Sequence, residues 1–226
     1  MINLEHYNLV LFDFDGLLVN TEEIHYRAYI AMCAGRGFEL PYTFVEYCQI
    51  AHYSAEGLER EIYRLLPQLQ QQEPNWKILY REKSEAYSRL IEQGQVSLMP
   101  GAEPLLVFLQ QNNIDHVVVT HSADFHVSAI KRRHPVLQGI PHWITREDYK
   151  EPKPSPECYR AAIKKFGAVR SVIGFEDTPR GLTALMGSTA KPVIVTTIPY
   201  PELPHFVAQG AVHLRSLDEV LYDRHN

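Results

Sequence analysis

Two aspartates separated by one residue follow an apolar segment near the start of the chain. Leu9–Phe12 has the composition of a buried strand, and Asp13, Phe14, Asp15 and Gly16 come next with no polar transition. Side chains alternate along an extended segment, so both carboxylates would point the same way if the strand continued. Paired carboxylates at a buried strand end repel each other and lose solvation, and a divalent cation would offset both costs. Taken alone, the short Asp-x-Asp-Gly string fits a solvated acidic turn equally well.

A second apolar run ends in acids. Val172–Phe175 is followed by Glu176 and Asp177, which cannot face the same way in an extended chain. Carboxylate oxygens are the ligands that Mg²⁺ prefers. The alternative is that Asp177 only caps the helix that starts near Pro179.

Two further segments carry groups suited to an anion. Thr120, His121 and Ser122 follow the β-branched run Val117–Val119, and a hydroxyl at a strand end beside a helix start can bind a phosphate oxygen or simply cap the helix. Lys153 lies between two prolines, which stiffen the backbone around it. An ammonium group held in place suits a site where arriving negative charge must be neutralised.

Composition limits the possible partners. The 226 residues carry a net charge of -5 and no basic block, which argues against nucleic acid. The three cysteines form no CxxC pattern, the N-terminus does not resemble a signal peptide, and no apolar run is long enough for a membrane span. We therefore expect a cytoplasmic protein that contacts neither nucleic acid nor a membrane.

The hydrophobic pattern predicts an α/β fold with an insertion. Residues from about 20 to 93 have helical periodicity, with helices from Thr21, over 42–50, from a Ser54 cap to Pro67 and over 75–93, and with a polar connector over 68–74. Strands are expected at 9–12, 116–120, 143–145, 172–175, 193–196 and 212–214, alternating with helices after residue 95. This alternation predicts a doubly wound, Rossmann-like parallel sheet formed by residues 1–18 and 95–226, with an inserted α-helical cap domain at 19–94. Ligands of such sheets bind at the carboxyl ends of the strands, where the acids lie.

Four motifs in order resemble those of the haloacid dehalogenase superfamily, in its phosphatase and phosphomutase branch. They are the string Asp13–Glu22, Thr120 after its strand, Lys153-Pro-x-Pro, and Phe175-Glu-Asp-Thr-x-x-Gly181. Two positions depart from the family pattern: Pro152 replaces the usual Gly, and Asn20 replaces the usual Asp.

The resemblance implies roles for individual residues. Asp13 would be the nucleophile and Asp15 the general acid and base. The phosphoryl oxygens would be held by Thr120, His121, Ser122 and Lys153. A Mg²⁺ cofactor would be bound by Asp13, the Asp15 backbone carbonyl, Glu176 and Asp177.

The implied function is hydrolysis of a small phosphorylated metabolite, such as a sugar phosphate, through an aspartyl-phosphate. The cap would close over the site and contact the substrate. The cap residues considered for that contact are His25, whose spacing from the first motif matches phosphomutases, and His52 and Ser54 in the loop that resembles the specificity loop.

Two alternatives remain open. A β-phosphoglucomutase-type phosphomutase is disfavoured because Ala55 stands where the mutase has an Arg and because the run His121–Asp124 lacks its phosphate-binding Lys. A catalytically silent, ligand-binding member of the fold is disfavoured because such a protein needs no full set of Asp13, Asp15, Lys153 and Asp177.

Overall fold

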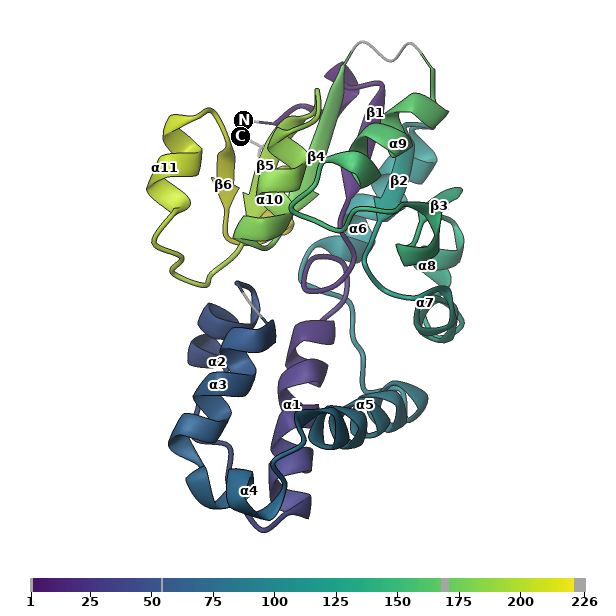
Figure 1. Ribbon diagram of the computed structural model, residues 1–226. Coiled ribbons are helices and arrows are strands. Elements are labelled where there is room, and N and C mark those ends of the chain that lie inside the picture. Colours follow the sequence, from purple (N-terminus) through teal and green to yellow (C-terminus); the bar gives the residue numbers. More distant parts are fainter. Residues whose placement is uncertain (1, 54, 168–170, 222–226) are drawn as a thin grey trace. The chain divides into compact units, whose positions relative to one another are not determined.

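The structure, a computed structural model, describes residues 2–53, 55–167 and 171–221 (Figure 1). The chain forms two compact units, Met1–Asn20 with Ser97–Asn226, and Thr21–Val96. The first unit is built around a parallel sheet and the second is helical. The predicted α/β class with a helical insertion is confirmed.

The sheet has six parallel strands in the order β3-β2-β1-β4-β5-β6. Their bounds are β1 Leu9–Phe12, β2 Asp115–Val119, β3 His142–Ile144, β4 Val172–Glu176, β5 Lys191–Val195 and β6 Val212–Leu214. In the register, Phe12 lies beside Val118 on one side and Phe175 on the other. The carboxyl ends of β2, β1 and β4 are therefore neighbours at one edge of the sheet.

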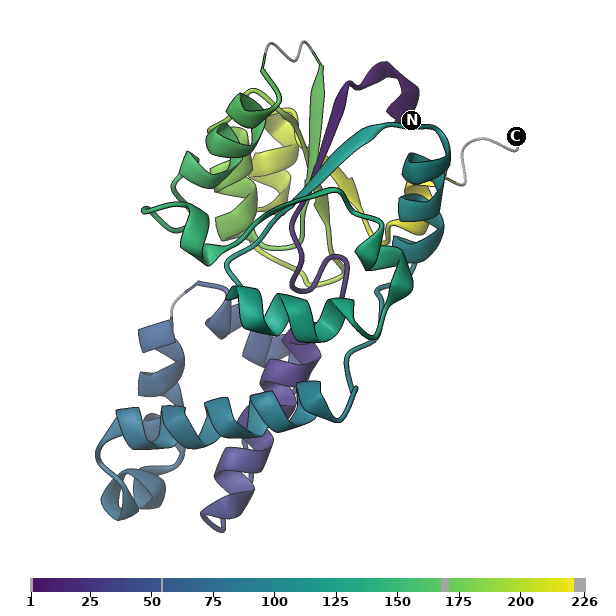
Figure 2. The ribbon, with the colours of Figure 1, turned by 90° about the vertical axis from the view of Figure 1, so that its right-hand side faces the viewer.

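Both faces of the central strand are buried. All four residues of β1 are buried, as expected for a parallel strand covered on both sides. Leu9 and Leu11 join a core cluster with residues of α9 (Glu157–Lys165) and α10 (Pro179–Met186), while Phe12 stacks on Phe175 at 5.2 Å. Figure 2 shows helices on both sides of the sheet. The other helices of this unit are α6 Ala102–Gln111, α7 Asp124–Lys131, α8 Pro135–Gln138, α11 Leu203–Ala208 and α12 Asp218–Leu221, with 3-10 turns at Leu4–His6 and Arg146–Asp148.

The helical unit contains α1 Thr21–Gly35, α2 Phe44–Ala51, α3 Ala55–Leu65, α4 Pro67–Gln72 and α5 Trp76–Glu92. Helix α2 starts two residues later than predicted because Thr43 and Glu46 form a capping box. The predicted polar connector at 68–74 is wrong over most of its length. Pro67 starts α4 at a position where a missing N–H costs nothing, and Leu69 of that helix is buried.

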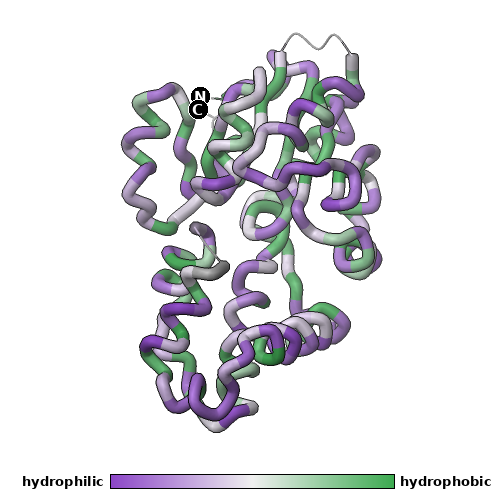
Figure 3. The backbone as a smooth tube through the Cα atoms, viewed as in Figure 1, coloured by the Kyte–Doolittle hydropathy of each residue, from purple (hydrophilic) through white to green (hydrophobic). Residues whose placement is uncertain are grey.

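The polarity of the helices follows their packing. Figure 3 shows hydrophobic and hydrophilic residues alternating along most helices, as one-sided burial requires. Within the described part of the chain, no helix has the length and apolar character to cross a bilayer.

The two passages between the units are joined by hydrogen bonds. Gly16 leaves β1 with φ 78°, a conformation that favours glycine, and Val19 then forms an isolated bridge with Leu98. The Asn20 N–H donates to the Ser97 carbonyl at 3.0 Å, and the Asn20 side-chain oxygen accepts from the Ser97 N–H at 2.7 Å. The oxygen is the atom that Asn shares with Asp, so the departure from the family pattern preserves this bond.

Candidate active site

The predicted chemical groups gather at one edge of the sheet. Asp13 follows β1, Thr120 follows β2, and β4 ends at Glu176 with Asp177 next. Each of these side chains is at least nine-tenths buried. The strand order brings them together because β1 lies between β2 and β4.

Lys153 links three strand ends. Its Nζ donates to Oδ1 of Asp13, to Oε1 of Glu176 at 2.7 Å and to the Val119 carbonyl at 3.1 Å. An ammonium has three protons, so this geometry uses all of them. The side chain is 6% exposed, and its position is set by the protein rather than by solvent.

Burial and neighbouring charges shift the pKa values of this pair. Burial raises the pKa of the Asp13 carboxyl well above its usual range, the carboxylates of Glu176 and Asp15 add to that effect, and Lys153 opposes it. Burial alone would lower the pKa of Lys153, but Asp13 and Glu176 raise it well above its ordinary value. The two carboxylates therefore favour the charged form of Lys153, and further positive charge beside Asp13 would lower the pKa of that carboxyl.

Asp15 is held by two hydroxyl groups. Oδ2 of Asp15 accepts from the hydroxyls of Thr120 and Ser122, each at 2.8 Å. The Ser122 N–H donates to the Thr120 hydroxyl oxygen at 2.9 Å, and the Tyr149 hydroxyl donates to the Thr120 carbonyl at 3.0 Å. The two predicted phosphate-binding hydroxyls thus fix the orientation of the Asp15 carboxyl in this structure.

His121 connects the Thr120 and Lys153 segments. Its Nε2 accepts from the backbone N–H of Lys153 at 2.8 Å, which places the ring proton on Nδ1 when the ring is neutral. Burial and the nearby charges of Lys153, Arg180 and Arg146 lower the pKa of His121 to about 3. The ring is therefore neutral at pH 7, and this geometry makes it a support for the Lys153 segment.

Three carboxylates have the arrangement of a cation site. Asp13, Glu176 and Asp177 each offer an oxygen, and these atoms lie within 4.8 Å of one another. With Asp15 there are four acids beside one ammonium, a charge imbalance that a divalent cation would reduce. Buried carboxylates are hard oxygen ligands, so the donor set fits Mg²⁺.

The comparisons with known proteins agree with this geometry. The family model for haloacid dehalogenase-like hydrolases matches residues 7–187, most of the chain. The chain belongs to that family. It is 27% identical over 191 residues to protein CbbY of Cereibacter sphaeroides, with 82% of each chain covered. It is 24% identical over 218 residues to a phosphorylated carbohydrates phosphatase of Thermotoga maritima, covering 94% of this chain and 95% of that one.

A solved relative has the same fold. The structure of CbbY from Rhodobacter sphaeroides in complex with xylulose-(1,5)bisphosphate matches at 25% identity and a TM-score of 0.67, covering 94% of this chain and 96% of that one. The predicted branch of the haloacid dehalogenase-like hydrolases, with a helical cap, is confirmed, and so is the enzyme class of phosphoric monoester hydrolase.

Two residues of this hydrolase site had no predicted role. The hydroxyl of Tyr159 donates to Oε1 of Glu176, and the Tyr159 ring lies 5.0 Å from Lys153 Nζ. A Cβ built on Gly181 would lie 2.0 Å from Oε2 of Glu176, so a side chain there would displace that carboxylate. Gly181 lies in the fourth motif and Tyr159 lies three residues after the third, but only the packing shows what they touch.

The structure describes two of the three residues considered for substrate contact, His25 and His52, both in the cap. Nδ1 of His25 lies 2.6 Å from the Nζ of Lys83, and its ring stacks on Tyr87 at 4.0 Å. Nε2 of His52 lies 2.9 Å from an Oε of Glu22. Ser54 lies outside the described residues. Lys83, which is 4% exposed, is a buried cation that the sequence did not single out.

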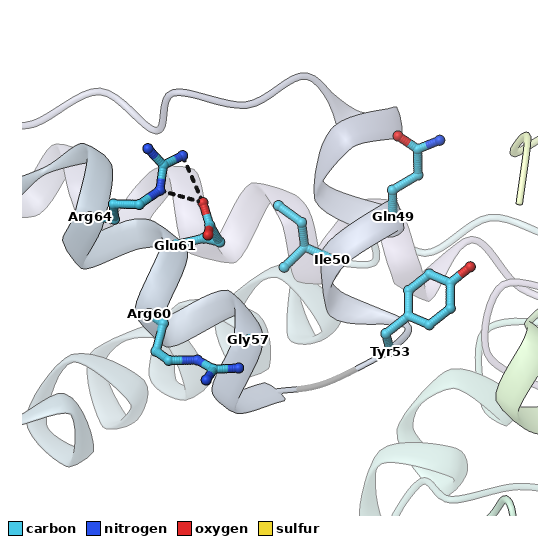
Figure 4. A pocket seen from close by; sticks show the side chains of 7 residues that line it. All are labelled: Gln49, Ile50, Tyr53, Gly57, Arg60, Glu61 and Arg64. Carbon is cyan, nitrogen blue, oxygen red and sulfur yellow. Dashed lines mark hydrogen bonds and ion pairs between the residues drawn. The ribbon is translucent and has the colours of Figure 1, made fainter. Parts of the chain in front are cut away.

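The cap also carries an open pocket of about 570 Å³ between α2 and α3 (Figure 4). It is lined by Gln49, Ile50, Tyr53, Gly57, Arg60, Glu61 and Arg64. Arg64 is paired with Glu61 at 2.8 Å within this lining. The pocket combines apolar, amide and cationic groups on the cap itself.

Proposed function

We propose that the protein is a Mg²⁺-dependent phosphatase that hydrolyses a small phosphate monoester through an aspartyl-phosphate on Asp13. The observation that carries this proposal is the convergence of Lys153 with Asp13 and Asp177, which follow the adjacent strands β1 and β4, each nearly removed from solvent. Phosphoryl transfer depends above all on positioning and charge neutralisation. A buried site of low dielectric constant supplies both.

In this mechanism an oxygen of the Asp13 carboxylate attacks phosphorus, and the bond from phosphorus to the ester oxygen breaks. Asp15, oriented by Thr120 and Ser122, donates a proton to the departing oxygen. Asp15 then takes a proton from the water that attacks the phosphoryl group, and inorganic phosphate and the free Asp13 carboxylate are released. Lys153 neutralises charge on the transferred group throughout.

The residues that would hold Mg²⁺ are Asp13, Glu176, Asp177 and the Asp15 carbonyl. Bound there, the ion would supply Lewis-acid stabilisation of the phosphoryl oxygens and favour the ionised form of Asp13. This role fits the raised pKa of the Asp13 carboxyl, because a cation there would lower that pKa again.

The relatives and the cap support a proposal about the substrate class. The relatives described above are named for phosphorylated carbohydrates or bound to a sugar bisphosphate. We extend this to a sugar phosphate or similar metabolite as the substrate here. His25 and His52 would act from the cap, where each is already held by a charged partner.

The test measures phosphate release from a panel of sugar phosphates and small phosphate esters, with Mg²⁺ or with EDTA. Asp13→Asn should lower kcat at least ~1000-fold because it removes the nucleophile. Asp115→Asn, the same change at an exposed residue at the opposite end of β2, is the matched control and should leave the rate unchanged.

Release that EDTA leaves intact, or that survives in Asp13→Asn, would refute the proposal. Isomerisation of β-glucose 1-phosphate without phosphate release would show a phosphomutase instead. Tight Mg²⁺ binding with no turnover across the panel would favour the binding role.

A further inference from the structure

Tyr159 is buried beside the catalytic cluster but is not part of it. It lies on α9, six residues after Lys153, and is among the largest side chains with no exposed surface. Its hydroxyl donates to Oε1 of Glu176, the same oxygen that accepts from Lys153. One carboxylate oxygen therefore binds both a neutral donor and a cation.

Glu176 is held on both sides of its carboxyl group. Tyr159 and Lys153 share Oε1, while Oε2 packs against Gly181, where even one added carbon would overlap it. A buried carboxylate without these partners would be free to rotate or to take up a proton. The Lys153 ammonium is divided between Glu176 and Asp13, whereas the Tyr159 hydroxyl has a single proton, which it donates to Glu176. The orientation of the Glu176 carboxylate therefore depends on the Tyr159 hydroxyl.

The position of Lys153 depends in turn on Glu176. The three acceptors of its ammonium lie at the carboxyl ends of β1, β2 and β4, and Glu176 is the one from β4. The Tyr159 ring lies 5.0 Å from the ammonium and adds a cation–π contact on the same side. Tyr159 thus contacts the cation and its carboxylate partner together.

We propose that Tyr159 is a positioning residue for phosphoryl transfer: its hydroxyl fixes Glu176, and through Glu176 it holds the Lys153 ammonium where the transferred phosphoryl group is neutralised. The proposal rests on the proposed function in one respect, the assignment of Lys153 to the phosphoryl oxygens. Tyr159 itself touches no reacting atom.

A double-mutant cycle between Tyr159→Phe and Glu176→Gln tests this coupling. Tyr159→Phe keeps the ring and removes the hydroxyl. It should lower kcat/KM about tenfold, mostly in kcat, since it removes one hydrogen bond to a charged group. In the Glu176→Gln background the same change should cost less than about twofold, because the carboxylate through which Tyr159 acts is already gone.

The second readout needs no turnover. Calorimetric titration with inorganic phosphate in the presence of Mg²⁺ should show affinity lowered several-fold by Tyr159→Phe, and the loss should vanish with Glu176→Gln. Tyr63→Phe is the matched control. Its hydroxyl donates to the Glu73 carbonyl inside the cap, so neither readout should change.

The outcomes separate the two proposals. If Tyr159→Phe causes the same fold-loss in the Glu176→Gln background as in the wild type, in both readouts, the role of Tyr159 is overturned, even if the enzyme is an active phosphatase. A coupled loss of phosphate affinity in a protein that releases no phosphate would support the positioning role and refute the proposed function. If Tyr159→Phe does not fold, Tyr159→Met, which fills the space without a hydroxyl donor, is run through the same cycle against the same criterion.

Discussion

Lys83 allows a worked prediction for the cap. This lysine is 4% exposed, lies 2.6 Å from Nδ1 of His25, and is close to the rings of Tyr29, Tyr80 and Tyr87. Burial lowers the pKa of Lys83 from 10.5 to about 8, although the Glu22 carboxylate opposes the shift. A difference of about 2.5 pKa units corresponds to about 3 kcal/mol, the cost of keeping the ammonium buried at neutral pH.

The sign of the pH dependence follows from proton uptake on unfolding. Between pH 8 and 10.5 the unfolded chain holds a proton on Lys83 that the folded chain has lost, so the free energy of unfolding rises with pH. Between pH 7.5 and 9.5 the contribution of Lys83 to this free energy should rise by about 2 kcal/mol, while the raised pKa of the Cys33 thiol opposes part of the total change. The range stops there because exposed tyrosines of the unfolded chain ionise near pH ~10.

Urea denaturation followed by fluorescence measures this effect. The chain has two tryptophans, Trp76 in α5 and Trp143 in β3, so a Trp143→Phe background reports on the cap alone. Lys83→Met should lower the change in unfolding free energy between pH 7.5 and 9.5 by about 2 kcal/mol relative to the wild type, while Lys77→Met, at an exposed position of the same helix, should leave it unchanged. An equal rise in Lys83→Met would refute the assignment of the shift to Lys83.

Two further predictions concern Glu22 and Gly181. Burial alone would raise the pKa of Glu22. Its hydrogen bond and charge interaction with a histidine outweigh burial, and the net result is a pKa lowered from 4.5 to about 2. The ionised carboxylate therefore stabilises the fold above pH 4.5, and that contribution is lost as the pH falls toward 2. The stability difference between the wild type and Glu22→Gln should shrink by about 3 kcal/mol between pH 5.5 and 2 in urea denaturation, and a difference independent of pH would contradict this. Gly181→Ala should lower the free energy of unfolding by about 2 kcal/mol and weaken Mg²⁺ binding in calorimetry, because its methyl group would lie 2.0 Å from Glu176. Gly35→Ala, with no atom within 4 Å of the added carbon, is the control, and equal effects of the two changes would argue against a steric cause.

Strand prediction succeeded where a short apolar run ends abruptly. The expected bounds of β1 and β6 match the structure, and Asp13 follows β1 as expected. The start of β5 was missed because Lys191 and Pro192 are poor strand formers, yet both pair with β4 through Ile173 and Gly174. Pairing with a neighbouring strand thus overrode local preference.

The interpretation of Pro67 was incomplete because tertiary packing, which the local sequence does not show, decides how a proline is used. Pro67 was taken as the end of a helix, but it also begins α4, since a proline is tolerated in a first turn. Nothing local distinguishes the two uses. Burial of Leu69 against the rest of the cap makes the short helix stable.

The sequence by itself determined which chemical groups follow which strands: two aspartates after the first, a hydroxyl after the second, and an acid pair at the end of the fourth. Local patterns carry this information because apolar periodicity and strand ends are properties of a few adjacent residues. They also showed that Lys153 lies in a stiff segment of its own.

Only the tertiary structure decided which groups meet. The order of the sheet places β1 between β2 and β4, so Lys153 reaches Asp13 across 140 positions of sequence and the Thr120 hydroxyl reaches Asp15. The contact of Tyr159 with Glu176 depends on how α9 packs on the sheet. Such contacts are set by long-range pairing and close packing, whose energies depend on the whole chain and leave no local pattern in the sequence.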